Sequence, residues 1–334
     1  MFLETTVIVC YNQLEKRNDE MDEKNNCNAD KNNNACRVHR FQNETGEGTI
    51  TVFNIFPGVL LAYNDFHMSY YDSVFKADQD VFCIDYCREG RLEYPAGKDS
   101  YSYVEAGDLK MDRRLTHVQR FEMPLSHYHG AMVAVDLKIA TKSIAEEVKN
   151  FPVDVRKLQQ KFCPDIYPNV IHEPAYVEHI FGELYHVPEK IKLAYFKIKV
   201  LELFLYLDAL EISDTPKEKP YFYKTQVEKT KAMKHFLEEH FHENFTQEVL
   251  AKQFEIPLTA MKQCFKSIYG MPIGTWMLQY RMNYAAERLI ADSNISIADL
   301  AGETGYDSQS KFALAFRRVM GMSPTEYRKQ KKSR

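Results

Sequence analysis

The chain has 334 residues, of which 45% are hydrophobic and 27% charged, and its formal net charge is −4. These ordinary globular values exclude fibrous, wholly disordered and membrane-embedded classes, and the length favours two domains. The seven cysteines are scattered without a Cys-x-x-Cys pair, and the first residues lack a basic lead or a cleavage site. We therefore expect a reduced, cytoplasmic chain.

The net charge conceals an asymmetry along the chain. Residues 221–334 carry 17 Lys and Arg against 12 Asp and Glu, a net charge of +5. Residues 1–220 carry 26 against 35, a net charge of −9. Such asymmetry is typical of a protein in which one domain meets a polyanion. The last third of the chain is therefore the candidate for binding nucleic acid.

The first 40 residues have the composition of a disordered tail. They contain eight Asn and little apolar material after Tyr11. Such a segment cannot bury enough surface to offset the entropy lost on ordering. We expect disorder over residues 1–40, and the sequence leaves open whether the chain starts at Met1 or Met21.

Residues 41–211 are expected to form an α+β domain, in which a small β-barrel is followed by helices. Up to Leu137, short segments rich in Val, Ile, Tyr and Phe are separated by Gly, Pro and Asn, which is typical of strands in a sandwich or barrel. In one of them Phe82, Ile84 and Tyr86 fall on the same side of the predicted strand.

The stretch 188–211 predicts the strongest helix of this domain, and it is apolar on two faces. Both faces could pack within the chain, or one could meet its copy in a homodimer. The candidate dimerisation residues are Ile198, Leu201 and Leu205. Two prolines and alternating charges then predict a linker over residues 212–225.

Residues 226–330 predict an all-α domain in which one pattern occurs twice, over 246–268 and 296–319. Each copy indicates a helix, a tight turn and a second helix. Several positions correspond between the copies: Leu250 with Leu300, Ala251 with Ala301, Met261 with Phe312, Phe265 with Phe316, and Gly270 with Gly321.

The second helix of each copy has an apolar inner face and a polar, basic outer face. A single helix-turn-helix with a basic face is often only a solvated hairpin, but two copies in the one net-positive domain favour DNA. The candidate DNA-binding residues are Thr259, Ala260, Lys262, Gln263, Lys266, Gln309, Ser310, Lys311 and Arg317.

A family resemblance in the last third of the chain is carried by Leu250-Ala251, Phe265-Lys266, Gly270, Arg281, Ala285, Leu300-Ala301, Gly305-Tyr306, Phe312, Phe316, Gly321, Ser323-Pro324 and Tyr327-Arg328. On these residues, the segment 225–330 resembles the DNA-binding domain of the arabinose-regulator (AraC/XylS) family of bacterial transcription factors. The resemblance implies two recognition helices that enter successive major grooves, in a ligand-responsive activator of transcription that binds double-stranded DNA and can contact RNA polymerase.

Two departures from the family pattern fall on the recognition helices. Pro257 replaces the usual capping Ser of the first, and Leu314 stands where the second usually carries an Arg. We therefore expect the first helix to supply most of the base readout and the second more of the phosphate contact. Gln263 is the candidate for a bidentate adenine contact, with Lys262 or Lys266 to guanine or phosphate.

The first domain resembles the cupin-like sensor domain found in many members of that family. The run YVEAGDLKM at 103–111 carries this resemblance. It implies a small-molecule effector at the mouth of the barrel. Arg88 could hold a carboxylate or phosphate, or be an ordinary surface Arg. The candidate ligand residues are Tyr86, Arg88, Tyr101 and Tyr103.

The alternative hypothesis is a cupin-type metalloenzyme, or a repair protein, fused to a DNA-binding domain. His127 and His129 stand two apart with His117 upstream, which could form an open metal site. However, the first predicted strand pair, CREGRLEY, contains no histidine, and no catalytic motif is evident. We expect neither enzymatic activity, nor a cofactor, nor a bound metal.

Overall fold

The structure is a computed structural model that describes residues 36–72, 80–113, 120–172, 176–211, 221–292 and 294–332. It separates into two compact units, which meet in the sequence between Tyr221 and Phe222. No helix in these ranges is long and apolar enough to cross a membrane. The two units are described separately below.

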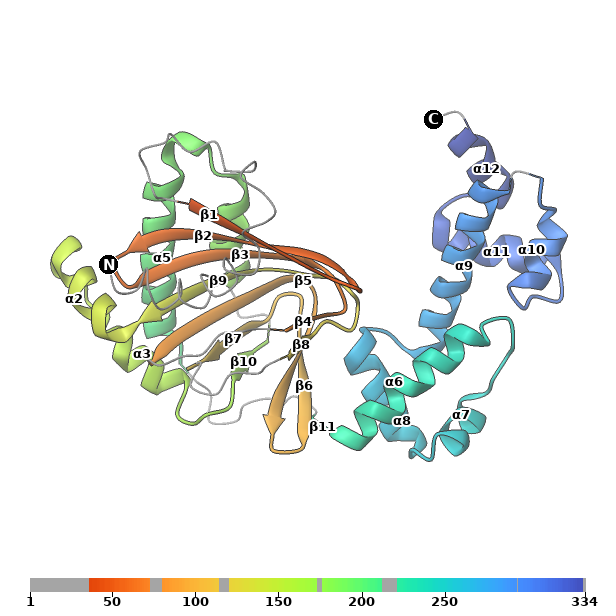
Figure 1. Ribbon diagram of the computed structural model, residues 1–334, viewed down its shortest axis with the longest axis horizontal. Coiled ribbons are helices and arrows are strands. Elements are labelled where there is room, and N and C mark those ends of the chain that lie inside the picture. The colour runs from red at the N-terminus through yellow and green to blue at the C-terminus, as the bar shows by residue number, and fades with distance from the viewer. Residues whose placement is uncertain are drawn as a thin grey trace. The chain divides into compact units, whose positions relative to one another are not determined.

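The N-terminal unit is built around an antiparallel sheet with the strand order β1-β2-β3-β9-β5-β6 (Figure 1). Strand β7 pairs with both β5 and β10, and a separate ribbon joins β4 to β8. The strands are β1 (Cys36–Asn43), β2 (Gly46–Phe56), β3 (Val59–His67), β4 (Tyr70–Asp72), β5 (Val81–Gly97), β6 (Ser100–Glu105), β7 (Leu109–Asp112), β8 (Arg120–Glu122), β9 (Tyr128–Asp136) and β10 (Asn169–Ile171).

Helices cover one face of this sheet (Figure 1). Helix α5 places Phe196, Val200 and Leu203 in the same buried cluster as sheet residues such as Phe53. The helical elements are α2 (Leu137–Glu147), α3 (Val155–Phe162), α4 (Val177–Glu183), α5 (Lys192–Ala209) and two 3₁₀ turns, η1 (Leu184–His186) and η2 (Glu189–Ile191).

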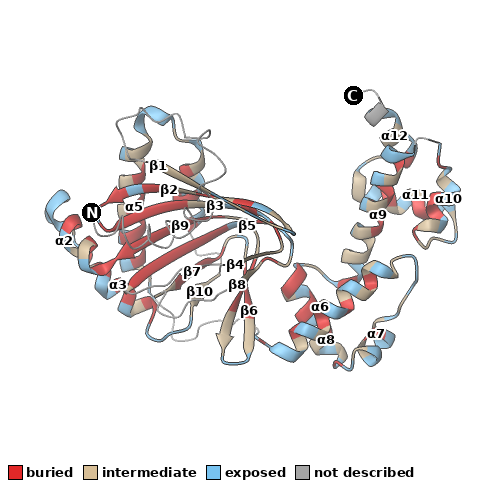
Figure 2. Cartoon of the chain, viewed as in Figure 1, coloured by how far each residue is buried: buried red, intermediate tan, exposed pale blue. Residues whose placement is uncertain are grey.

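The alternation predicted for β5 is confirmed. Phe82, Ile84 and Tyr86 all face the helices in one buried cluster. Cys83 and Cys87 point to the other face, where they join two further clusters. Because both faces of β5 are covered, residues 81–87 are all buried, including Asp85, which pairs with Lys110 at 2.7 Å. Figure 2 shows the central strands largely buried.

The expectation of a closed barrel is wrong for the described residues, because their strands form an open sheet with no pairing between β1 and β6. The physical reason lies in what fills the apolar face of the sheet. In a closed barrel, inward side chains pack against opposite strands, whereas here Phe53 and Ile84 pack against helices. The mixed α and β composition of the chain is as predicted.

Two predicted boundaries also need correction. The tail predicted over 1–40 lies outside the described residues up to residue 35, but residues 36–40 belong to β1, where Arg37 and His39 pair with Val52 and Ile50 of β2. The linker predicted over 212–225 lies outside them from 212 to 220. Its last two residues instead begin a helix, α6, at Lys224.

The C-terminal unit is almost entirely helical, as predicted. Its helices pack through buried side chains, which include Phe265, Met282, Leu300, Phe312 and Phe316. The elements are a short strand β11 (Phe222–Tyr223) and the helices α6 (Lys224–Glu239), α7 (Gln247–Gln253), α8 (Leu258–Tyr269), α9 (Ile273–Ala291), α10 (Ile297–Glu303), α11 (Gln309–Met320) and α12 (Pro324–Lys332).

Candidate nucleic-acid interface

Helices α7 and α8 form the first helix-turn-helix. Thr246 caps α7 by accepting a hydrogen bond from the backbone N–H of Val249 at 3.3 Å. Pro257 stands at the cap of α8 and makes no side-chain cap, as the sequence indicated. Met261 and Phe265 are fully buried, so the opposite face of α8 is held outward.

Helices α10 and α11 form the second helix-turn-helix. Ser296 caps α10 through the N–H of Asp299 at 3.0 Å, and Ser308 caps α11 through the N–H of Lys311 at 3.3 Å. Gly305 makes the turn between them with φ +77°, a conformation that favours glycine. Both second helices are thus held by a short turn and a buried apolar face.

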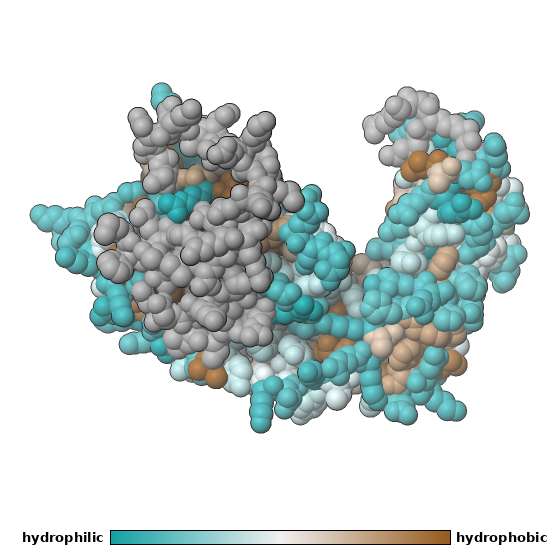
Figure 3. All heavy atoms as spheres, in the orientation of Figure 1, coloured by the Kyte–Doolittle hydropathy of each residue, from teal (hydrophilic) through white to brown (hydrophobic). Residues whose placement is uncertain are grey.

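The nine residues predicted to bind DNA all lie on α8 or α11. Eight of them are exposed and Ala260 is half-buried. The surface of this unit that Figure 3 presents is mainly hydrophilic, with smaller hydrophobic patches. The two outer faces therefore offer amide, hydroxyl, ammonium and guanidinium donors, which are the groups that contact base edges and phosphates.

Two further side chains belong to the outer face of α11. Leu314 is 74% exposed, and Arg318 is exposed beside Arg317. Sequence reasoning treated Leu314 only as a missing arginine, because it selected polar residues. The signal available in the sequence was its position, three residues after Lys311 and three before Arg317, which places it on their face.

The guanidinium of Arg281, on α9, connects the two helix-turn-helix motifs. It donates to the backbone oxygens of Phe241 at 2.6 Å and Glu243 at 2.7 Å, and to Oδ1 of Asn244 at 3.0 Å. The amide of Asn244 in turn donates to the backbone oxygen of Gly305 at 3.3 Å. The loop before α7 and the turn between α10 and α11 are therefore joined through Arg281 of α9 and Asn244.

The candidate ligand residues of the N-terminal unit lie in two local environments. The Tyr86 ring stacks on Phe181 at 4.8 Å, and the Arg88 guanidinium lies 4.2 Å from the centre of the Tyr185 ring. Burial raises the pKa of Tyr185 to about 12, so its hydroxyl stays protonated.

The other two candidates belong to strand β6, where Tyr101 pairs with Pro95 of β5 and the Tyr103 hydroxyl donates to Glu93 at 2.7 Å. Tyr103 is 1% exposed, which makes its ring part of the interior.

One of the two apolar stripes of the helix predicted at 188–211 is covered and the other is not. Ile198 is 61% exposed, Leu205 is 44% exposed, and Leu201 is half-buried. Ile198 and Leu205, together with Ile191, which is 49% exposed, are spaced seven residues apart, as in the seam between two paired helices.

Comparison with known proteins finds similarity in the C-terminal unit. The model of the helix-turn-helix domain family matches residues 250–330. The chain is 34% identical over 96 residues to the HTH-type transcriptional regulator ExsA of Pseudomonas aeruginosa, covering 29% of this chain and 34% of that protein. It is 33% identical over 93 residues to the virulence regulon transcriptional activator VirF of Yersinia enterocolitica, covering 28% and 34%.

Among solved structures, the chain is similar to the DNA-binding domain of AdpA in complex with a target DNA. The identity is 29%, the match covers 31% of this chain and 93% of that one, and the TM-score is 0.29. The match to ExsA and VirF spans about a third of the length of each relative.

Proposed function

We propose that this chain is a transcriptional activator that binds specific sequences of double-stranded DNA through its C-terminal unit, a helix-turn-helix domain of the AraC type. The observation that carries the proposal is the pair of second helices, α8 and α11, whose outer faces expose the polar and basic residues proposed to read DNA. In this proposal the protein is cytoplasmic, and it binds DNA without catalysing a reaction.

In this proposal α8 and α11 read DNA differently. Gln263 is exposed in the middle of α8 and is placed to pair with an adenine edge, flanked by Lys262 and Lys266. On α11, exposed Leu314 offers an apolar contact for a thymine methyl group, and Lys311 and Arg317 offer phosphate contacts.

Replacing Gln263 with alanine tests the assignment of α8. We expect the affinity for the preferred site to fall by about 1–3 kcal/mol, with relaxed preference at one base position, because a bidentate base contact is lost. Selection of bound sequences from a random DNA pool, with the full chain and the variant, measures both effects.

The control for that experiment is Gln279→Ala, which removes an exposed glutamine from α9 instead. It should leave the selected sequences unchanged. Failure of the unmodified chain to enrich any sequence contradicts the proposed function. An unchanged profile for Gln263→Ala contradicts only the role of that residue.

We further propose that two copies of the chain pair through the exposed stripe of α5. Ile198 and Leu205 of α5, with Ile191 directly before that helix, recur every seven residues, which suits packing against an identical helix across a two-fold axis. A dimer would place two DNA-binding domains on one stretch of DNA.

Replacing Ile198 with glutamate should convert this dimer to a monomer, because it buries a charge in an apolar seam. Light scattering coupled to size-exclusion chromatography gives the mass directly. Ile290→Glu is the matched control, since Ile290 is also exposed, at 55%, but lies on α9. A monomeric unmodified chain, or a dimer retained by Ile198→Glu, contradicts the proposal.

The N-terminal unit, an open sheet covered by helices on one face, is proposed to be a sensor for a small-molecule effector. The basis for an anionic ligand is Arg88, whose side chain is 41% exposed beside the Tyr185 ring, where such a ligand would compete with the carboxylate of Glu89, 3.7 Å from its Nε. Effector binding would favour one arrangement of the units over another and so change how a dimer spans its sites.

A further inference from the structure

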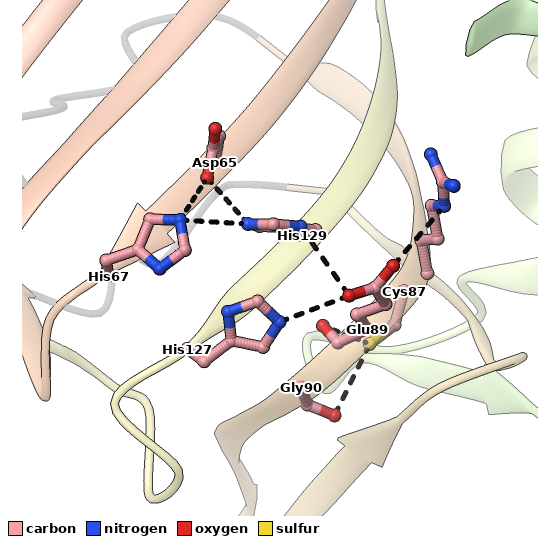
Figure 4. A network of polar contacts seen from close by, with 8 residues as sticks. Asp65, His67, Cys87, Glu89, Gly90, His127 and His129 are labelled. Atoms are coloured by element: carbon pink, nitrogen blue, oxygen red, sulfur yellow. Dashed lines mark hydrogen bonds and ion pairs between the residues drawn. The ribbon is translucent and has the colours of Figure 1, made fainter. Parts of the chain in front are cut away.

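Three imidazoles and two carboxylates gather at one end of the sheet of the N-terminal unit (Figure 4). His67 ends β3, His129 lies near the start of β9, and His127 directly precedes β9. Asp65 of β3 and Glu89 of β5 lie on either side of His129. In the sequence, His67 lies 60 positions before His127 and 62 before His129, so only the fold brings His67 to the other two histidines.

The register of the sheet explains why these side chains share a face. Asp65 is the cross-strand partner of His129, and His129 is also the partner of Glu89. Directly paired residues project to the same side of a sheet, and so do residues two apart in one strand. His67 therefore projects to the side on which Asp65 and His129 lie, and His127, directly before β9, lies beside them (Figure 4).

On the β3 side, the two imidazoles and the carboxylate lie close together. Oδ1 of Asp65 lies 2.6 Å from Nε2 of His129 and 3.0 Å from Nε2 of His67, which are hydrogen-bond distances. The two Nε2 atoms are 3.3 Å apart. Two ligands of a tetrahedral zinc ion, each about 2.0 Å from the metal, lie about 3.3 Å apart, which agrees with the separation of the two Nε2 atoms.

His127 and Glu89 complete the cluster on the β5 side. Oε2 of Glu89 lies 3.4 Å from Nε2 of His127 and 3.8 Å from Nδ1 of His129. The rings of His127 and His129 have their centres 4.2 Å apart. One nitrogen from each of the three histidines lies within 4.8 Å of the others.

We propose that His67, His127 and His129 bind a divalent transition-metal ion, with Asp65 beside the site as the carboxylate that positions the imidazoles of His67 and His129. Three imidazoles suit Zn²⁺, whereas Mg²⁺ and Ca²⁺ prefer sites made of oxygen atoms alone. The carboxylate of Glu89 lies 3.8 Å from Nδ1 of His129, on the side of the ring where partners of metal-bound histidines commonly lie.

The cluster is open enough for an ion to enter. The side chain of His67 is 58% exposed and that of Asp65 54%, whereas His129 beneath them is 27% exposed. A bound ion would fasten the end of β3 to β9. This site goes beyond the proposed function and does not depend on it.

The structure also changes which histidines form the site. The spacing in the sequence suggested His117 as the third ligand, but His117 lies outside the described residues. The antiparallel pairing of β3 with β9 supplies His67 instead.

Zinc binding by the full, tag-free chain tests the proposal. After removal of metal with a chelator, the chain is dialysed against Zn²⁺ and its metal content measured, and the affinity is obtained by calorimetry. We expect one Zn²⁺ per chain. Replacing the ion with Co²⁺ should give the intense visible absorption of a tetrahedral site.

Single variants locate the site. His67→Ala and His129→Ala should abolish stoichiometric binding, and Asp65→Asn should weaken it at least about tenfold. His67→Cys should restore binding, because a thiolate is also a zinc ligand. The matched control is His179→Ala, which removes a histidine that is 52% exposed on α4 and should bind as the unmodified chain does.

Circular dichroism of each metal-free variant establishes that it is folded. Replacement of His67 should disturb folding least, because its side chain is exposed at the end of a strand. Substoichiometric metal in the unmodified chain overturns the proposal. So does full binding by folded His67→Ala and His129→Ala, since the ion would then lie elsewhere. Loss of binding in every variant including His179→Ala would also overturn it.

Discussion

Replacing Gly305 with alanine should destabilise the C-terminal unit by about 3 kcal/mol. Gly305 has φ +77°, and a Cβ atom there would lie 2.2 Å from the backbone oxygen of His242. The new side chain also approaches Arg281 Nη2 at 3.3 Å. Because the first clash is with backbone, relief requires the loop before α7 to move, which breaks the contacts between the two helix-turn-helix units.

The measurement is denaturant unfolding followed by tryptophan fluorescence. Trp276 is the one tryptophan of the chain and lies in α9, so its emission reports on the C-terminal unit alone. Gly302→Ala is the matched control, because it lies inside α10 with nothing within 4 Å of the new Cβ. That control should be about 0.5–1 kcal/mol more stable than the unmodified chain. Equal midpoints for Gly305→Ala and the unmodified chain would contradict the steric argument.

Replacing Arg281 with methionine should have an effect of similar size. The substitution keeps the length of the aliphatic side chain but removes three hydrogen bonds from a buried position. The oxygens of Phe241, Glu243 and Asn244 lose their charged donor, and leaving such acceptors unpaired costs about 3 kcal/mol in total. We also expect weaker binding to DNA sites that need both recognition helices, because Arg281 fixes one helix-turn-helix relative to the other.

Arg288→Met is the control for this prediction. Arg288 lies on the same helix but pairs with Glu303 at 3.1 Å in a partly exposed ion pair, and such pairs contribute little. The same fluorescence measurement and a titration with the selected DNA site compare the two variants. If both lose the same stability, the buried network of Arg281 is not what joins the units.

The C-terminal unit could be predicted in detail because its structure is encoded locally. Apolar residues at helical spacing, Thr246 and Ser296 as caps, and Gly305 at the turn all act within a few positions of themselves. The repetition of the pattern provided an independent check. What local pattern could not reveal was the network of Arg281, whose acceptors lie 37–40 positions away along the chain.

The N-terminal unit was less predictable because its contacts are distant in sequence. The strands and the two faces of β5 followed from composition and alternation. The strand order did not, because β9 lies between β3 and β5 through pairings such as Leu61 with Val133. Alternation determines the face of a side chain but not the neighbouring strand, so the predicted barrel was not distinguishable from an open sheet packed on helices.

The sequence by itself predicted that the last third of this protein binds DNA. The +5 charge of its last third, the repeated helix-turn-helix and the polar outer faces of α8 and α11 are all properties of short segments. Only the tertiary structure decided which distant residues meet, because strand pairing and helix packing depend on the whole chain. It left Ile198 and Leu205 uncovered on α5, and it placed His67 beside His129, a pairing on which the proposed metal site rests.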